Sequence, residues 1–112
     1  MSALTERKKK EIDMLYRKMK AKRSKVFLNI LINSNVKISR RIGERITKSI
    51  YRLGDVQYSS YSLGTNNFTA EAQWNESDAV GKVDLLKIMI ARLLDVHPSM
   101  VIVQAKILYR VD

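Results

Sequence analysis

A row of cationic side chains recurs at helical spacing between residues 41 and 52, and binding to phosphate is the chemistry it suits best. The row consists of Arg41, Arg45, Lys48 and Arg52, with Arg40 beside it. Separations of four, three and four residues place the members of this cation row along one face of a helix. Like charges at this spacing repel by about 0.2–0.5 kcal/mol per pair. A counter-charge from Glu44 and another element, or from a ligand, would relieve that repulsion, and an ordinary solvated helix face is the alternative.

A second group of cations lies in the first 25 residues. The members most suited to phosphate contact are Lys8, Lys9, Lys10, Arg17 and Lys18. Apolar residues Ile12, Leu15, Tyr16 and Met19 recur at helical spacing, which predicts a helix over about residues 6–23. Its apolar face is too narrow to fold alone. Such an arm would bind RNA or DNA without recognising sequence, while a contact with an acidic protein or a solubilising role remain alternatives.

The distribution of charge along the whole chain supports a polyanionic partner. Residues 1–52 carry 16 Lys and Arg against 4 acids, and residues 53–112 carry 5 against 7, for a net charge of +10. A surface without a specialised partner usually mixes its signs. We therefore expect RNA or DNA as the partner, and the sequence does not distinguish between them.

Catalytic and cofactor-binding patterns are absent from the sequence. The chain has no cysteine, which excludes disulfides, thiolate catalysis and cysteine-ligated metals. Its one histidine, His97, precedes Pro98 and is typical of a helix end. We find no catalytic triad, glycine-rich phosphate loop or metal-ligand spacing. The sequence therefore predicts a protein that is not an enzyme and has no metal or cofactor.

Membrane and secretory segments are also not apparent. No apolar run approaches the roughly 18–20 residues that a membrane span needs. Residues 1–10 lack the apolar core of a secretory signal. We expect a cytoplasmic protein, with association to a nucleoid, a ribosome or another particle as an option.

Six elements are expected after the basic arm. Alternating or β-branched residues predict strands over 26–33, 56–63, 68–74 and 100–111. Helices are expected from 37 or 39 to about 53 and from about 75 to 96. The order β-α-β-β-α-β predicts an α+β domain of the ferredoxin-like kind, with both helices on one face of a four-stranded antiparallel sheet. We therefore divide the chain into a helical arm, 1–25, and a single domain, 26–112.

This order of elements resembles the RNA-recognition-motif domain, and residues 26–112 have a suitable length. Val26-Phe27-Leu28 is similar to the start of the first-strand motif of that family, which puts Phe27 at a base-stacking position. The third-strand motif departs from the family, because residues 66–73 offer one aromatic and an acid. Packing in the fold is the alternative role for Phe27. Tyr58 and Tyr61 lie on opposite faces of their strand, so one of the two should be exposed and available for stacking.

The second helix is more apolar than a surface helix requires. Val83, Leu86, Ile90 and Leu93 share the face expected to meet the sheet. Four further apolar residues spread towards the flanks, namely Leu85, Ile88, Met89 and Leu94. These residues predict a contact with a second copy of the chain, with the N-terminal helix or with a partner protein, and an ordinary buried helix is the alternative.

Two hypotheses for function follow from the sequence. The first is a small nucleic-acid-binding protein that contacts phosphates through the basic arm and the cation row. The second is a protein–protein interaction module, either a subunit of a ribosomal, viral or phage assembly or an inhibitor of a larger complex. In the second hypothesis the apolar helix and the basic patch would carry the contact.

Overall fold

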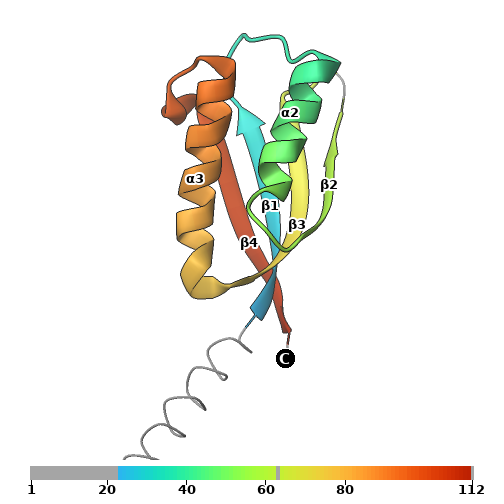
Figure 1. The fold of residues 1–112 in the computed structure, drawn as a ribbon, viewed down its shortest axis with the longest axis vertical. Helices are drawn as coiled ribbons and strands as arrows, with labels where there is room; N and C mark the ends of the chain where they lie inside the picture. The colour runs from blue at the N-terminus through green and yellow to red at the C-terminus, as the bar shows by residue number, and fades with distance from the viewer. Residues whose placement is uncertain (1–22, 63, 112) are drawn as a thin grey trace, which may run out of the picture.

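A four-stranded antiparallel sheet carries two helices on one of its faces (Figure 1). The computed structural model describes residues 23–62 and 64–111. In chain order the elements are β1 (Arg23–Ile32), α2 (Arg40–Tyr51), β2 (Val56–Tyr61), β3 (Asn67–Asn75), α3 (Glu76–Leu94), a short 3-10 helix (Pro98–Met100) and β4 (Val101–Val111). The strand order is β2-β3-β1-β4, so that β1 and β3 are central. The predicted α+β class is confirmed.

The first strand begins at Arg23, three residues before the predicted start at Val26. Arg23 pairs with Asn75 of β3, and the neighbouring Ser24 is fully buried. The Ser24 hydroxyl donates a hydrogen bond to the Glu76 carboxylate at 2.9 Å. Arg23 and Ser24 are polar but belong to the strand, because β3 extends alongside them and pairs with them. The helix predicted over residues 6–23 lies almost wholly outside the described residues.

The core lies between the sheet and the two helices. The strands supply the apolar faces that their alternation predicts, and both helices supply residues at helical spacing. The buried residues include Val26, Leu28, Ile30 and Ile32 of β1, Phe68, Ala70, Ala72 and Trp74 of β3, and Ile46, Ile50, Leu86 and Ile90 of the helices. The buried isoleucines of α2 fix the rotation of that helix about its own axis, so its opposite face points to solvent.

The far end of α2 is tied to β3 and α3. The Trp74 indole N–H donates a hydrogen bond to the Gly54 carbonyl at 2.8 Å. The Lys82 ammonium donates to the Leu53 carbonyl and lies 5.5 Å from the centre of the Trp74 ring. Lys82 is therefore engaged in holding the helices together.

No helix within the described residues is long and apolar enough to cross a membrane.

A tight contact between α2 and β2 leads to a prediction about stability. A methyl group at Gly43 would lie 2.7 Å from a ring carbon of Tyr61, whose ring packs on Phe68 at a centroid distance of 5.1 Å. At Gly43→Ala the crowded ring has to shift, which costs about 1–3 kcal/mol, and better helix propensity offsets about 0.5–1 kcal/mol of that cost, so we expect a net loss of up to about 2 kcal/mol in the free energy of unfolding.

Gly81→Ala is the matched control, because nothing lies within 4 Å of the added methyl group. That helical position should instead gain about 0.5–1 kcal/mol from better helix propensity. Denaturant unfolding of both variants measures the difference. Equal stabilisation by the two substitutions would show that Tyr61 does not restrict position 43.

Candidate nucleic-acid interface

The cation row lies on the outer face of α2, and all of its members are exposed. The neighbouring Arg40 forms an ion pair with Glu44 at 3.8 Å, but the two side chains are 82% and 62% exposed, so the pair contributes little to stability. Among the described residues, the members of the cation row form no ion pair. Their charges are therefore available to an external anion.

The cations at the start of α2 do not favour the stability of that helix. Arg40 and Arg41 stand in the first turn, at the positive end of the helix dipole, and the first turn contains no acid. A cation at that end is unfavourable by about 0.3–1 kcal/mol. Repulsion within the row adds to that cost. Lys48, in the last turn, is favourably placed, so the cost to helix stability comes from the first turn and from repulsion within the row.

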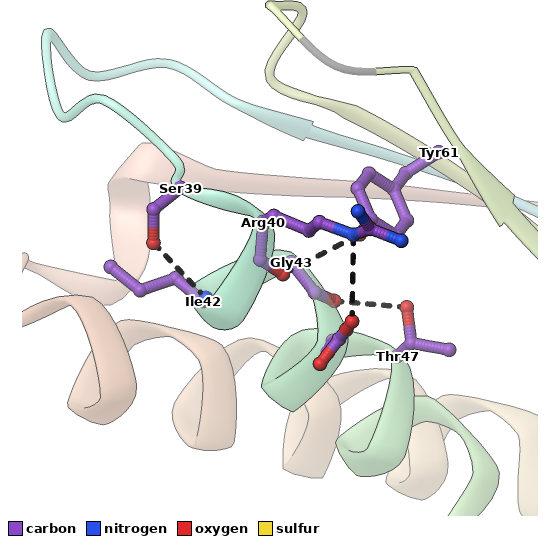
Figure 2. Close-up of polar contacts among 7 residues, drawn as sticks. Ser39, Arg40, Ile42, Gly43, Thr47 and Tyr61 are labelled. Atoms are coloured by element: carbon purple, nitrogen blue, oxygen red, sulfur yellow. Dashed lines mark hydrogen bonds and ion pairs between the residues drawn. The ribbon is translucent and has the colours of Figure 1, made fainter.

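The backbone that carries the first arginines is firmly held (Figure 2). The Ser39 hydroxyl caps the helix by accepting the Ile42 N–H at 3.2 Å. The Tyr61 hydroxyl lies 3.5 Å from the Arg40 carbonyl, to which it donates. The start of α2 is thus fixed on β2, whereas the guanidinium groups extend into solvent.

The opposite face of the sheet has no covering layer among the described residues. One row of residues crosses all four strands there, and consists of Tyr58, Glu71, Phe27 and Lys106. Tyr58 is 52% exposed, while Tyr61 lies on the helix side, as expected from their opposite faces. Phe27 is half-buried on the uncovered face. Tyr58 and Phe27 are therefore the two predicted stacking residues that share this face.

The charges on the uncovered face largely pair with one another. The Lys25 ammonium lies 3.5 Å from the Glu71 carboxylate and also donates a hydrogen bond to the Gln57 side chain. Only 14% of the Lys25 side chain is exposed. A central acid and a neutralised lysine make this face a weaker site for phosphate than the outer face of α2.

The predicted apolar contact residues of α3 separate into two groups. Leu85 and Ile88 are 51% and 43% exposed. Met89 is partly buried and packs against the core, and Leu94 belongs to the core itself. Helical spacing puts Leu94 four residues after Ile90, on the buried face. Of these four predicted residues, Leu85 and Ile88 are the ones that present substantial apolar surface.

Further candidate contacts for phosphate are the cations of the N-terminal segment and Lys37. The predicted contacts at Lys8, Lys9, Lys10, Arg17 and Lys18 lie outside the described residues. The exposed Lys37, which we did not predict, stands two residues before the N-cap of α2 and extends the basic surface. The sequence signal for including Lys37 was its position at the predicted start of the helix that carries the cation row.

Two hollows of the described surface are lined by residues other than the cation row. One of about 560 Å³ is formed by the loop after β1 and the turn that contains His97, and another of about 530 Å³ lies beside residues 34–39. Within the described residues no group of three or more His, Cys, Asp or Glu side chains could hold a metal ion.

Comparison with family models, curated proteins and solved structures finds no match to this chain. Its function is therefore inferred from the residues and the geometry described above.

Proposed function

We propose that this chain is a small, non-catalytic nucleic-acid-binding protein that contacts phosphates through the outer face of α2 and the basic N-terminal segment. The observation that carries the proposal is the cation row, which is exposed and whose members form no ion pair among the described residues. An intracellular location follows, because nucleic acid is found there. RNA and DNA both fit this chemistry.

The cation row suits the backbone of a nucleic acid better than its bases. Eleven residues separate Arg41 from Arg52, which at 1.5 Å per residue is about 16 Å along the helix. Phosphate contacts fix position and orientation but convey no sequence. α2 carries no Asn or Gln to pair with adenine, so guanine is the base that its cations could contact in addition to phosphate. Binding should therefore depend weakly on sequence and strongly on charge.

A salt titration tests the proposal. We expect log K for a fluorescein-labelled DNA duplex to fall linearly with log salt concentration between about 50 and 200 mM, as condensed counterions are released. Four phosphate contacts alone predict a slope near −3.6, and contacts from the N-terminal segment would steepen it. A single-stranded RNA measured in parallel ranks the two ligands. Absence of binding to both at low salt would contradict the proposal.

The finer fold assignment belongs to this proposal as well. We infer a ferredoxin-like domain, which is supported by the order of elements, the central β1 and β3, and two helices on one face of the sheet. The uncovered sheet face with Phe27 and Tyr58 is compatible with an added contact to bases. Its smaller unpaired charge makes that contact secondary to the cation row.

A protein–protein interaction module is the second candidate, and one observation favours it. Leu85, Ile88 and Val80 expose 51%, 43% and 70% of their surface on α3. Such residues suit an apolar docking surface. The salt titration separates the candidates, because an apolar contact responds weakly to salt whereas a phosphate contact weakens steeply.

A further inference from the structure

Within residues 23–62 and 64–111, the outer edge of β4 is a long strand edge with unpaired backbone groups. β4 spans Val101–Val111, and β1 is its one partner strand in that part of the chain. The Met100 carbonyl accepts the Asn33 N–H at 2.7 Å, and hydrogen-bonded positions alternate along an antiparallel pair. The N–H and C=O groups of Val103 and Ala105 therefore point outward from the edge of the sheet, away from β1. A row of such groups is satisfied best by another extended strand.

This edge also gathers exposed apolar side chains. Ile102, Ile107, Leu108 and Tyr109 are 38%, 48%, 43% and 57% exposed. Protein edges are usually protected by charges, proline or short length. β4 has eleven residues, no proline and two cations, of which Arg110 is paired with Glu76 at 3.2 Å. β2, the other edge strand, is protected by its six-residue length and a shift in register.

We propose that a second copy of this chain occupies the β4 edge, so that two β4 strands pair antiparallel across a twofold axis. Antiparallel pairing is self-complementary, as a twofold interface requires. A register centred on Gln104 sets Lys106 opposite Ile102 of the other copy and avoids like charges in contact. Val103 and Ala105, beside the axis on the helix side, are small.

The area available is close to what a stable dimer needs. Eleven strand residues extend over about 37 Å. A sheet with one layer of helices is about 20 Å deep, so the strip at the edge measures roughly 700 Å². Standard interfaces bury about 800 Å² per partner. The β4 edge with the flank of α3 is therefore large enough to hold two copies together.

The consequence for binding rests on the proposed function. A twofold axis perpendicular to the sheet leaves all four helices on the same face of an eight-stranded sheet. Both cation rows then point to the same side, and one nucleic acid can contact both. A dimer should show a salt slope about twice that of a monomer, because twice as many phosphates are neutralised.

Molar mass in solution tests the dimer independently of nucleic acid. We expect sedimentation equilibrium of the full chain to give a molar mass that approaches twice the 12.9 kDa of one chain as the protein concentration is raised to roughly 1 mM. Ala105→Pro removes an outward N–H, and Ile107→Lys puts a charge on the edge. Both variants should sediment as monomers with unchanged circular-dichroism spectra, because neither breaks a hydrogen bond to β1.

Leu31→Lys is the matched control for Ile107→Lys, because it adds the same charge at an apolar side chain of similar exposure on the central strand β1, away from the proposed contact. This control should remain a dimer. A wild-type monomer throughout the concentration range would overturn the proposal, and so would a dimer that survives both edge substitutions. A wild-type protein that forms the dimer but does not bind nucleic acid would count against the proposed function and not against the dimer.

The absence of native cysteine allows a direct check of the register. Gln104→Cys should form a disulfide-linked dimer under mild oxidation, because directly opposed residues of an antiparallel pair bring their Cβ atoms to about 4.5–5.5 Å. Gln57→Cys on β2 serves as the control and should remain largely monomeric. Equal cross-linking of the two variants would refute pairing centred on Gln104.

Discussion

Reversing Arg41 and Arg45 to glutamate is expected to weaken binding to a DNA duplex more than tenfold at about 50 mM salt. The double substitution changes the charge of the outer face of α2 by four units and leaves two cations of the row. Fewer phosphate contacts also make the salt slope shallower, by roughly two. Fluorescence anisotropy over a salt series measures both quantities. The fold should persist, since both side chains are exposed.

A variant with the same change in net charge controls for long-range electrostatics. Lys87→Glu combined with Lys106→Glu alters one residue on α3 and one on the uncovered sheet face, away from the cation row. We expect this control to lose much less affinity than the α2 variant. Equal losses would mean that net charge, and not the cation row, determines binding.

Removing residues 1–22 is the second change for which we expect a large effect. This segment carries eight Lys and Arg against three acids. Losing five net positive charges should lower affinity for DNA at least tenfold at low salt, and should flatten the salt slope by as much as about 4. The remaining chain should fold, because β1 begins at Arg23 and the described core is formed by later residues.

A truncation that extends three residues further, to residue 25, is the control for the deletion of residues 1–22. Removing residues 1–25 also deletes the fully buried Ser24 and its hydrogen bond to Glu76. We expect that shorter chain to lose at least about 1–3 kcal/mol of stability relative to the chain that starts at residue 23, because Arg23 and Lys25 and their pairing with β3 and β4 are lost as well. Thermal melts followed by circular dichroism make the comparison. An unfolded product from the 1–22 deletion would show that the segment completes the core.

Local patterns in the sequence were sufficient for most of the secondary structure. The alternation in Val26, Leu28, Ile30 and Ile32 predicted a strand with one buried face, and the structure confirms it. Ser39 and Gly54 marked the ends of the first core helix because capping and left-handed conformations are local requirements. The start of β1 was missed because Arg23 and Ser24 are polar. Their place in the sheet depends on β3, which is remote in sequence.

The same distinction applies to the candidate interface. Spacing alone placed the cation row on one helix face, opposite Ile46 and Ile50, and the structure confirms that it is exposed. Spacing also showed that Tyr58 and Tyr61 face opposite ways. Whether Tyr61 or Tyr58 meets the helices was decided by the pairing of Tyr61 with the buried Phe68.

The sequence by itself determined the charge of this protein, the order of its elements and the apolar face of each one, because those properties depend on residue type and period. Tertiary structure decided which strand lies at an edge and which cations have partners. β4 is an edge strand, and Lys25 is neutralised whereas Arg45 has no ion pair among the described residues. Those properties depend on contacts between residues distant in sequence, which no local pattern encodes.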